Sequence, residues 1–392
     1  MSEFTYYDLA QKINFKYIHV LAWRDLDDAE AGGSELHAHE ILKRFAEHGL
    51  NVTMRTSVAF GHSKYGTRNG YTVSRKGSRY TVFFRSAASW VAHPKDRAQA
   101  LIEVWNGMPF FSPLWANVPR LTIIHHVHAE MWNLVFNNHL ATVGQNIEER
   151  LAPLFYRKEN ILTPSESTAS ELITRLKLPA KNIQVVHPGI DSKFSSDFVV
   201  KSKIPLVISV GRLVPVKQHV KLLQILVEVK KQVDNLKVVI AGDGYEKQSL
   251  IDFVLENKCQ DWVSLPGRIS DDELITLYRS AWIIVSNSIR EGWGLTLAEA
   301  AACGTPSVAT DIIGHRDLIK NNVTGYLVKN DSEFVQKVVS LLKDKDTLQR
   351  FSTDAQTIVK DCSWDSVADK AVELLVTSYM KKYQISDNSI SS

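Results

Sequence analysis

Two distant stretches of this chain share one pattern, in which an apolar, β-rich strand runs into a glycine-containing loop and then into a helix. In the N-terminal half the pattern predicts a strand, a helix and a second strand at residues 16–23, 34–48 and 51–56. In the C-terminal half it predicts the same order at residues 204–210, 220–230 and 236–241, with further strands near 262–265 and 282–285. Strands that alternate with helices in this way form parallel, doubly wound sheets. The chain is therefore expected to be an α/β protein with two Rossmann-like domains.

The length of the chain, 392 residues, fits two domains of roughly 200 residues each. The polar, lysine-bearing stretch 191–203 shows no clear periodicity and is the expected linker. We therefore expect an N-terminal domain at 1–196 and a C-terminal domain at 197–365. An amphipathic helix is expected from Trp364 to about Tyr383.

Composition excludes several classes of protein. Hydrophobic residues make up 44% of the chain and charged residues 23%, which is the normal range for a soluble globular protein. No apolar run approaches the roughly 18 residues of a membrane span, and the N-terminus has neither the basic start nor the apolar stretch of a signal peptide. Cys259, Cys303 and Cys362 are too widely spaced for a disulfide framework or a Cys-x-x-Cys zinc site. A cytoplasmic location is expected.

Residues 290–310 carry the most specific signal in the sequence. Glu291 follows an apolar strand, a Gly-Trp-Gly turn comes next, and an alanine-rich helix runs from there to Gly304. Glycines let a ligand approach the backbone, and the N–H groups at a helix N-terminus favour an anion. A second carboxylate, Glu299, lies on the helix. The layout suits a nucleoside diphosphate, with phosphate on the amides and hydroxyl groups on the two carboxylates.

This segment closely resembles the E-x7-E signature of retaining glycosyltransferases of family four. The resemblance covers the first carboxylate, the glycine–aromatic–glycine turn, the second carboxylate and the Gly-Thr-Pro-Ser-Val-Ala tail. It implies the GT-B fold, in which two Rossmann-like domains face a cleft, with the donor site mainly in 197–365 and the acceptor site mainly in the N-terminal half. It also implies that a C-terminal helix at 366–384 packs back on the N-terminal domain. The donor-binding residues implied by the resemblance are Glu291, Gly292, Trp293, Gly294, Leu295 and Glu299.

Two cations follow the first strand of the C-terminal half. Arg212 and Lys217 lie in a loop that reads Gly-Arg-Leu-Val-Pro-Val-Lys, and a guanidinium fork and an ammonium group both suit a diphosphate. Taken alone, such a pair is more simply interpreted as solvated. The loop is similar to the family's Gly-Arg-Leu-x-x-x-Lys element, which implies that both cations hold the donor's phosphates.

The Gly32-Gly33-Ser34 loop gives the N-terminal half its own helix start. It is either a tight turn capped by Ser34, a good N-cap residue, or a ligand contact. In similar enzymes the corresponding glycine loop touches the transferred sugar or phosphate, which implies such a contact for Gly33.

Three histidines, His125, His126 and His128, follow the apolar strand expected at 121–124. Imidazole is a zinc ligand, but no complementary cluster of ligands is evident in the sequence. In similar enzymes a histidine at the end of the matching strand lies beside the transferred sugar. This implies that role for His125, with His126 as the alternative, and leaves structural hydrogen bonds for the others.

Two further motifs are interpreted as carrying no function. Asp25-Leu26-Asp27 has the Asp-x-Asp spacing of metal-dependent glycosyltransferases, but it precedes a glycine loop and is expected to be solvated. Gly242-Asp243-Gly244 begins like a dinucleotide fingerprint but has Lys247 in place of the third glycine. No metal and no cofactor are therefore expected.

The resemblance implies a metal-independent enzyme that moves a hexosyl unit from a nucleotide-diphosphate sugar to an acceptor hydroxyl, with retention at the anomeric carbon. The expected catalytic residues are Glu291, His125, Arg212 and Lys217. The acceptor would be a glycan, a glycolipid or a small molecule, and no nucleic-acid partner is expected. A nucleotide-sugar epimerase with the same two-domain plan and a non-catalytic nucleotide-sugar-binding module are the alternatives.

The interval between Glu47 and Asp96 holds eight basic residues and no acidic one. Its cations are Arg55, Lys64, Arg68, Arg75, Lys76, Arg79, Arg85 and Lys95. A solvated basic face is one interpretation. The other is a contact from residues 48–95 to a phosphate-bearing acceptor or to an anionic membrane, where each cation contributes roughly 1 kcal/mol. The second interpretation predicts a peripheral protein at the inner face of the membrane.

Overall fold

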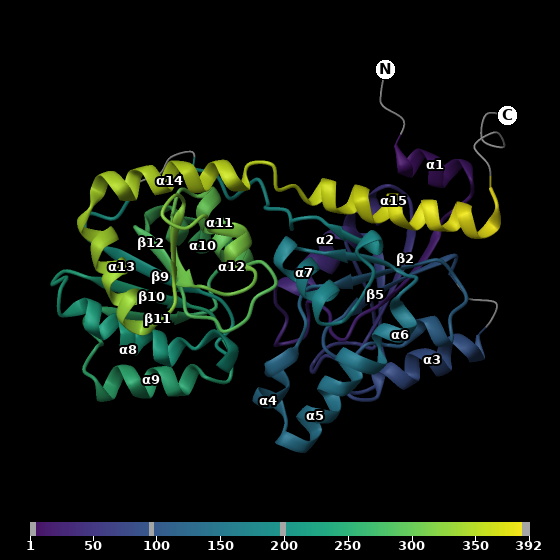
Figure 1. The fold of residues 1–392 in the computed structure, drawn as a ribbon, viewed down its shortest axis with the longest axis horizontal. Coiled ribbons are helices and arrows are strands. Elements are labelled where there is room, and N and C mark those ends of the chain that lie inside the picture. The colour runs from purple at the N-terminus through teal and green to yellow at the C-terminus, as the bar shows by residue number, and fades with distance from the viewer. Residues whose placement is uncertain (1–4, 94–97, 197–200, 386–392) are drawn as a thin grey trace. The chain divides into compact units, whose positions relative to one another are not determined.

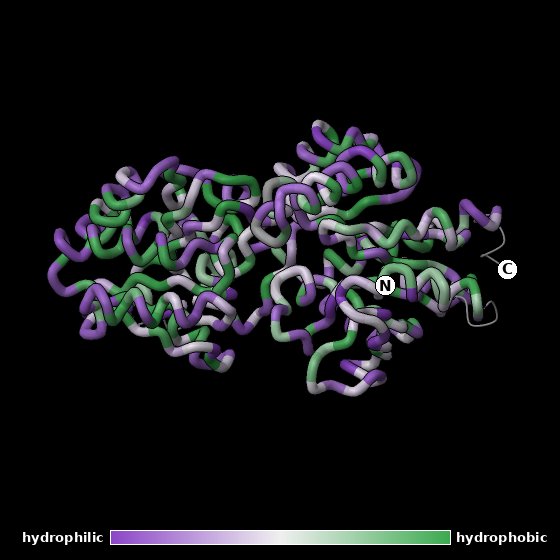
Figure 2. Tube along the Cα trace, turned by 90° about the horizontal axis from the view of Figure 1, so that it is seen from below, coloured by the Kyte–Doolittle hydropathy of each residue, from purple (hydrophilic) through white to green (hydrophobic). Residues whose placement is uncertain are grey.

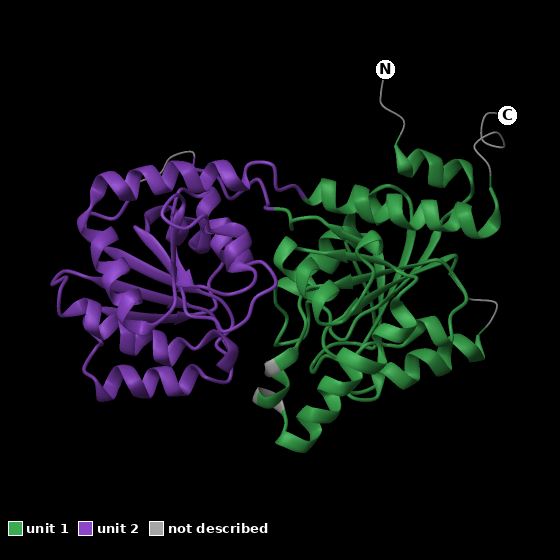
Figure 3. Cartoon of the chain, in the orientation of Figure 1, with its two compact units in different colours: residues 1–189, 364–392 green, residues 190–363 purple. Residues whose placement is uncertain are grey.

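The computed structural model describes residues 5–93, 98–196 and 201–385. The chain divides into two compact units, the first formed by Met1–Gly189 with Trp364–Ser392 and the second by Ile190–Ser363 (Figure 3). The division after Gly189 comes a few residues before the expected boundary after residue 196. Residues 197–200 of the expected linker lie outside the described residues.

The first unit is built on an eight-stranded sheet with the order β3-β4-β2-β1-β5-β6-β7-β8. All neighbours in this sheet pair in parallel except β3 and β4, which form an antiparallel pair. The strands are β1 (Tyr17–Leu21), β2 (Asn51–Thr56), β3 (Tyr65–Arg68), β4 (Tyr71–Arg75), β5 (Ala100–Trp105), β6 (Arg120–Ile124), β7 (Asn160–Thr163) and β8 (Ile183–Val185).

Helices flank this sheet (Figure 1). They are α1 (Tyr6–Lys12), α2 (Gly33–Glu47), α3 (Val82–Ala92), α4 (Trp132–Val135), α5 (Asn138–Asn146), α6 (Pro153–Tyr156), α7 (Glu166–Thr174) and α15 (Trp364–Tyr383). The last of these follows the whole second unit in sequence yet contacts α1, α2 and β6. The Phe15 and Tyr379 rings lie 5.0 Å apart, and Asn160 Nδ2 donates a hydrogen bond to Ser378 Oγ at 2.8 Å. The helix therefore belongs to the first unit.

The second unit is built on a six-stranded, all-parallel sheet with the order β11-β10-β9-β12-β13-β14. Its strands are β9 (Leu206–Val210), β10 (Lys237–Ala241), β11 (Val263–Gly267), β12 (Ile283–Ser286), β13 (Ser307–Thr310) and β14 (Gly325–Val328). Its helices are α8 (His219–Lys230), α9 (Lys247–Glu256), α10 (Asp271–Ser280), α11 (Leu295–Ala302), α12 (His315–Leu318), α13 (Asp331–Lys343) and α14 (Lys345–Val359). Counted along the chain, the order is 3-2-1-4-5-6, the strand order of a Rossmann fold.

The core of the second unit lies on both faces of its sheet. Val207 and Ile208, neighbours on β9, are both fully buried but belong to two different apolar clusters. Successive side chains of a strand point to opposite faces, so a strand that is covered on both faces reads as a continuous apolar run. Figure 2 shows such hydrophobic stretches inside each unit, with hydrophilic segments at the periphery.

Candidate active site

The strand order of the second unit brings together two loops that are far apart in sequence. β9 and β12 pair in parallel, with Ile208 opposite Ile284, although β10 and β11 separate them along the chain. The chain therefore reverses its direction of winding between β9 and β12. In open α/β sheets, ligands bind outside the carboxyl ends of the strands at this switch point. The loop after β9 carries Lys217, and the loop after β12 carries Glu291.

The two loops are joined by an ion pair in which Lys217 Nζ donates to Glu291 Oε1. The same carboxylate oxygen accepts a hydrogen bond of 2.8 Å from Ser288 Oγ. The side chains of Lys217 and Glu291 retain 18% and 16% of their exposure, so both are close to the surface but largely withdrawn from water. A predicted phosphate-binding cation and a predicted sugar-binding carboxylate thus meet in one cluster.

His315 completes this cluster and was not predicted from the sequence. Its Nδ1 lies 2.8 Å from the carbonyl oxygen of Thr310, and its ring is buried. Burial alone would raise the pKa of Glu291, but the charges of Lys217 and His315 and the hydrogen bond from Ser288 hold this pKa below its usual value. Burial lowers the pKa of His315 despite the nearby carboxylate. Glu291 is therefore an anion at neutral pH, ready to accept hydrogen bonds from hydroxyl groups.

The glycine–tryptophan–glycine turn leads directly into helix α11. Gly294 is the N-cap residue, and Leu295 begins the helix. Gly294 has a φ of +96°, in the left-handed region that residues other than glycine rarely adopt. Backbone N–H groups at this end are available to an anion. Trp293, in contrast, is 5% exposed and packs in an apolar cluster of the second unit. A role for Trp293 in donor binding stays a prediction.

Glu299 lies on the buried face of α11. It is 8% exposed and accepts a hydrogen bond of 2.9 Å from Tyr278 Oη. Burial raises the pKa of Glu299 to about 7, although the Tyr278 hydrogen bond and the charge of Lys193 act in the opposite direction. The carboxyl group is thus poised between its neutral and ionised forms near physiological pH.

Arg212 lies in the loop that follows β9, and the Gly242-Asp243-Gly244 motif supports this loop. A Cβ atom at Gly242 would lie 1.8 Å from the carbonyl oxygen of Gly211, and one at Gly244 would lie 2.3 Å from that of Leu213. Leu213 N donates to Asp243 O at 2.9 Å. The two loops therefore pack backbone against backbone, which only glycine permits. This motif therefore positions the Arg212 loop.

In the first unit, the glycine loop leads into α2 with Gly32 as its N-cap residue. The alternative in which Ser34 caps the helix is wrong, because Ser34 lies inside the helix and its hydroxyl donates to Glu35 Oε2 at 3.0 Å. The same oxygen accepts the Gly32 N–H at 2.8 Å, so Glu35 closes the helix start. A Cβ atom placed on Gly33 would meet no atom within 4 Å, so the backbone here is open to a ligand.

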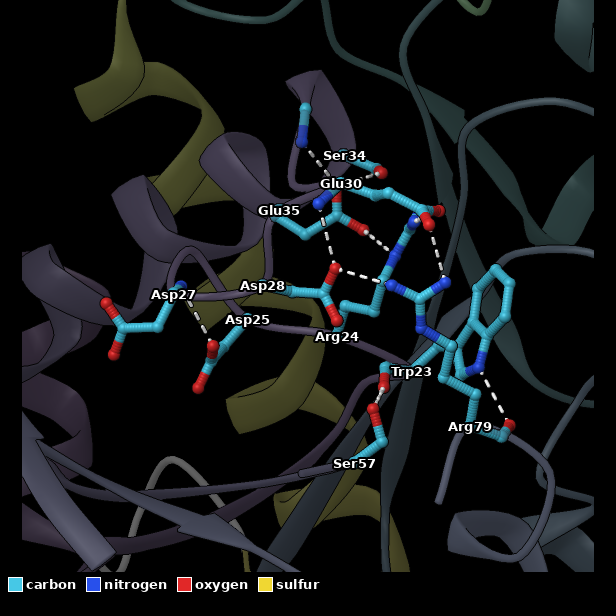
Figure 4. Close-up of polar contacts among 11 residues, drawn as sticks. Trp23, Arg24, Asp25, Asp27, Asp28, Glu30, Ser34, Glu35, Ser57 and Arg79 are labelled. Atoms are coloured by element: carbon cyan, nitrogen blue, oxygen red, sulfur yellow. Dashed lines mark hydrogen bonds and ion pairs between the residues drawn. The ribbon is translucent and has the colours of Figure 1, made fainter. Parts of the chain in front are cut away.

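A network of charges holds the loop before α2 (Figure 4). Arg24 Nη1 donates to Glu30 Oε2 at 3.0 Å, and its Nε lies 3.4 Å from Glu35 Oε1. Arg79 bridges the loop from the other side, with Nη1 2.7 Å from Glu30 and Nη2 2.9 Å from Asp28. The glycine loop is thereby anchored to two arginines.

The expectation that Asp25-Leu26-Asp27 is solvated is also wrong. Asp25 is 2% exposed and lies 2.7 Å from Arg75 Nη2, while Asp27 pairs with both Arg68 and Arg75. These aspartates are distant in sequence from their partners, so no local signal reveals the pairing. Since Arg79 also pairs with acidic residues, three of the cations in the basic interval are neutralised inside the unit. Lys95 lies outside the described residues.

His125 follows β6 and meets a residue that the sequence did not single out. His125 Nε2 lies 2.8 Å from Nδ1 of His37, which is on α2. Both rings are buried, and burial lowers the pKa of His125 to about 4 and that of His37 well below its usual value. Two neutral imidazoles therefore share one hydrogen bond, which fixes the His125 ring relative to the helix that begins at Gly33.

The rest of the histidine loop is held by Glu148, also absent from the sequence prediction. It lies in a π-helical turn, Ile147–Leu151, and accepts hydrogen bonds of 2.8 Å from His128 N and from Trp132 Nε1. Burial raises the pKa of Glu148 to about 7. The His126 and His128 rings stack with their centroids 5.0 Å apart. Within the described ranges, no group of three or more His, Cys, Asp or Glu side chains forms a candidate metal site.

Two family models match the chain. The description "Glycosyltransferase Family 4" applies to residues 31–194, and "Glycosyl transferases group 1" applies to residues 191–358. None of the helices that the structure describes is long and apolar enough to cross a membrane.

Known proteins show the same relationship. An uncharacterized glycosyltransferase of Methanocaldococcus jannaschii is 26% identical over 374 residues, covering 88% of this chain and 94% of that protein. The GtfA subunit of a UDP-N-acetylglucosamine–peptide N-acetylglucosaminyltransferase from Streptococcus agalactiae is 27% identical over 237 residues, covering 57% of this chain but only 46% of that protein.

Among solved structures, sucrose-phosphate synthase from Thermosynechococcus elongatus is similar with a TM-score of 0.75 at 17% identity, over 95% of this chain and 100% of that one. This likeness supports the GT-B fold with two Rossmann-like units, the class predicted from the sequence. The two family models together extend over residues 31–358, and the chain is a glycosyltransferase whose second half matches the group 1 model.

Proposed function

We propose that the protein transfers a hexosyl unit from a nucleoside-diphosphate sugar to an acceptor hydroxyl, with retention at the anomeric carbon. The observation that carries this proposal is the Lys217–Glu291 pair at the switch point of a unit that matches the group 1 model. A relative that uses UDP-N-acetylglucosamine agrees with a nucleotide-sugar donor. The family membership favours a transferase over an epimerase or a binding module.

The donor's diphosphate would lie against the loop after β9 and the N-terminus of α11. Arg212 and Lys217 would offset the charge that grows on the leaving diphosphate, and the backbone N–H groups at Gly294 and Leu295 would add donors. Such preorganised charges act most strongly on the transition state because water is excluded from them. Donor binding would replace part of the Lys217–Glu291 contact with contacts to phosphate and sugar.

The carboxylates would hold the donor's hydroxyl groups. Glu291, an anion fixed by Ser288, would accept hydrogen bonds from the sugar, and Glu299 would accept them from the ribose. In a retaining reaction, the leaving phosphate oxygen stays on the face where the acceptor hydroxyl attacks and takes up its proton. The task of the protein is then positioning and charge stabilisation. In the first unit, Gly33 and His125 would contact the transferred sugar or phosphate.

We further propose that the enzyme needs no divalent metal and acts in the cytoplasm. The side chains of Arg212 and Lys217 would do the work of a metal ion at the diphosphate. The acceptor would be a glycan, a glycolipid or a small molecule. A peripheral membrane contact through residues 48–95 would rest on fewer cations than the sequence suggests, because Arg68, Arg75 and Arg79 are paired internally.

The test is incubation of the full-length protein with a panel of nucleotide sugars, with and without candidate acceptors. Release of nucleoside diphosphate that depends on the acceptor supports transfer, and NMR of the product reports the anomeric configuration. Formation of an epimer of the donor would instead identify an isomerase. Binding without turnover of any donor and acceptor pair would leave only a binding module.

A further inference from the structure

A cavity of about 790 Å³ lies within the first unit, between the sheet and helix α3. Its walls come from β1, β2 and β4 on one side and from α3 on the other. Its volume is within the usual range for small-molecule sites, about 300–1,000 Å³. The lining residues are Tyr17, Ile18, His19, Asn51, Val52, Thr53, Arg55, Gly70, Thr72, Ser74, Lys76, Ser86, Ser89, Trp90, His93 and Ala98.

The floor of the cavity is polar because of how three strands are aligned. The strand register places His19 opposite Thr53, and Thr53 opposite Thr72, in one row across the sheet. The next row in the same direction places Arg55 opposite Ser74. Alternate residues of a strand share a face, so these two rows lie on the same face. Parallel sheets are normally apolar on both faces. Polar side chains on a face that a helix covers therefore need hydrogen-bond or ion-pair partners in the space between the sheet and the helix.

The opposite face of the same strands is apolar. Ile18 and Val20 on β1, and Val52 and Met54 on β2, are each 3% exposed or less. Apolar and polar residues therefore alternate along much of these strands, although Leu21, which shares a face with His19, is apolar and packs with Val82 and Trp90 of α3. This alternation distinguishes them from β9 and β12 in the second unit, whose two faces are both covered by apolar clusters. The polar face is thus a local property of the sheet beside α3.

Arg55 is the buried cation of this face. It is 5% exposed, and its Nε has no hydrogen-bond partner among the described residues. No carboxylate pairs with its guanidinium in the described part of the chain, whereas Arg75, on the neighbouring strand β4, pairs with Asp25 and Asp27. A buried arginine is costly without an anion, because its desolvation is not offset. The unit neutralises Arg68, Arg75 and Arg79 but leaves Arg55 for an anion from outside.

The surroundings of Arg55 strengthen the demand for an anion. The described residues that line the cavity include the second cation Lys76 and no Asp or Glu. Burial and then the charge of Arg55 lower the pKa of His19 to about 4, so this ring is neutral at pH 7. The nearest charged neighbour on α3, Arg85, has the same sign as Arg55. From α3, Ser86 and Ser89 line the roof of the cavity, and Ser86 Oγ donates a hydrogen bond of 2.7 Å to the carbonyl oxygen of Val82.

The cavity also has a direction. Arg55 and Lys76 line one end, and Asn51 lies four residues from Arg55 on β2, so the ends are about 13 Å apart at about 3.3 Å per residue. Between them lie Thr53, Thr72 and other neutral hydrogen-bonding groups. A ligand with a phosphate at the cationic end and hydroxyl groups along the neutral end would pair with both the cations and the neutral hydrogen-bonding side chains.

We propose that this cavity is a binding site for a small phosphorylated polyol such as a sugar phosphate. Arg55 and Lys76 hold the phosphate, and the threonine, serine, asparagine and histidine side chains bond the hydroxyl groups. The site lies wholly within the first unit, so it does not depend on the donor site proposed around Lys217 and Glu291. Two cations of the basic interval, Arg55 and Lys76, would then bind an anion inside the first unit.

The test is isothermal titration calorimetry of the full-length protein with glucose 6-phosphate, inorganic phosphate and glucose. We expect saturable binding of glucose 6-phosphate, weaker binding of phosphate and none of glucose. Arg55→Met should weaken glucose 6-phosphate at least tenfold without lowering the thermal midpoint of the ligand-free protein, because it removes an unpaired buried charge. Lys76→Gln should weaken binding several-fold. The matched control is Lys64→Gln, an exposed cation of the same interval that does not line the cavity, and it should bind like wild type.

A further variant separates this site from the donor site. Lys217→Ala should leave glucose 6-phosphate binding unchanged, and loss of binding in this variant would place the sugar phosphate in the second unit and overturn the proposal. Absence of saturable binding to wild type, or equal affinity in wild type, Arg55→Met and Lys76→Gln, would also overturn it. Displacement of glucose 6-phosphate by phosphatidylinositol vesicles, but not by phosphatidylcholine vesicles, would assign the phosphate to a lipid headgroup and contradict the small-molecule assignment. If Arg55→Met fails to fold, Lys76→Gln decides.

Discussion

Lys217 Nζ and Glu291 Oε1 form an ion pair between the loops that follow two neighbouring strands, β9 and β12. Both residues belong to the cluster proposed to hold the diphosphate and the sugar of the donor. In the ligand-free protein the charge of each side chain is therefore neutralised by the other. The pair keeps Glu291 ionised in spite of its burial, so removing either partner changes the state of the other.

This relationship predicts strongly coupled effects on transfer. Lys217→Ala, Arg212→Ala and Glu291→Ala should each reduce turnover at least about 100-fold, the scale of one lost transition-state contact. Lys217→Ala with Glu291→Ala should cost much less than the product of the two single losses, because each single variant already disables the pair. Steady-state kinetics of wild type, the three single variants and the double variant measures this. Near-wild-type donor affinity and turnover in Arg212→Ala combined with Lys217→Ala would refute the diphosphate assignment.

Glu299 predicts a pH dependence of donor binding. Burial raises the pKa of its carboxyl group in the free protein to about 7, and the ionised carboxylate accepts hydrogen bonds from ribose hydroxyls more strongly than the neutral carboxyl group does. Donor affinity should therefore rise as the pH increases from about 6 to about 8. Calorimetry with a nucleoside diphosphate across this range tests it, and the readout is the difference from Glu299→Gln, because the terminal phosphate of the ligand also titrates here but does so equally in both proteins. A wild-type affinity that falls over this interval would contradict the assigned role.

The same shift has a defined sign for stability. The folded pKa of Glu299, about 7, lies above the ordinary value of 4.5, so the folded state binds the proton more tightly than the unfolded state. Its contribution to the free energy of unfolding is therefore fully present below about pH 4.5 and is lost as the pH rises toward 7. Urea unfolding at both ends of this window should show a smaller loss in Glu299→Gln than in wild type.

Local periodicity was enough to predict many of the elements. Strand β2 (Asn51–Thr56) and helix α15 (Trp364–Tyr383) have the expected bounds, because an alternating strand and an amphipathic helix each leave a clear pattern in the sequence. The pattern also located the loops that carry Lys217 and Glu291. Strand order decides which of these loops are neighbours, and the local sequence pattern does not predict strand order.

The residues that were missed owe their positions to tertiary contacts. His315 joins Glu291 only because β12 and β13 are neighbours in the sheet, and His37 on α2 meets His125 although 88 residues separate them along the chain. Asp25 was expected to be solvated, since its partner Arg75 lies on a strand far along the chain. In each case the signal is a pairing between distant side chains, and a single sequence contains no record of such pairings.

Metal independence is the next prediction. The Asp-x-Asp motif, which could otherwise hold a cation, is occupied by arginines, because Asp25 pairs with Arg75 and Asp27 with Arg68 and Arg75. Turnover should therefore persist after exhaustive chelation with EDTA and dialysis. Asp27→Asn should not create or remove a dependence on added ions. Complete loss of turnover on chelation that manganese or magnesium restores would refute this prediction.

Gly33 predicts a loss of activity without a loss of stability. A Cβ at this position would meet open space, and alanine favours the first turn of α2 over glycine by up to about 1 kcal/mol. Gly33→Ala and Gly33→Val should therefore melt close to wild type but turn over progressively more slowly, by about tenfold or more, if the ligand approaches the backbone here. Thermal melts and kinetics on the same preparations check this. Full activity in Gly33→Val would show that no ligand reaches the loop.

The internal pairing of the basic interval makes the last prediction. Arg75 is 4% exposed, and its loss would leave the buried Asp25 without its cation. Arg75→Met should therefore lower the free energy of unfolding by about 3 kcal/mol or more, as expected when one partner of a buried pair is removed. The exposed Lys64→Met should change it by less than about 0.5 kcal/mol. Urea denaturation measures both. Equal stability of the two variants would mean that Arg75 behaves as a surface cation and remains available to an anionic membrane. The expected difference would instead restrict vesicle-binding tests to the exposed cations Lys64 and Arg85.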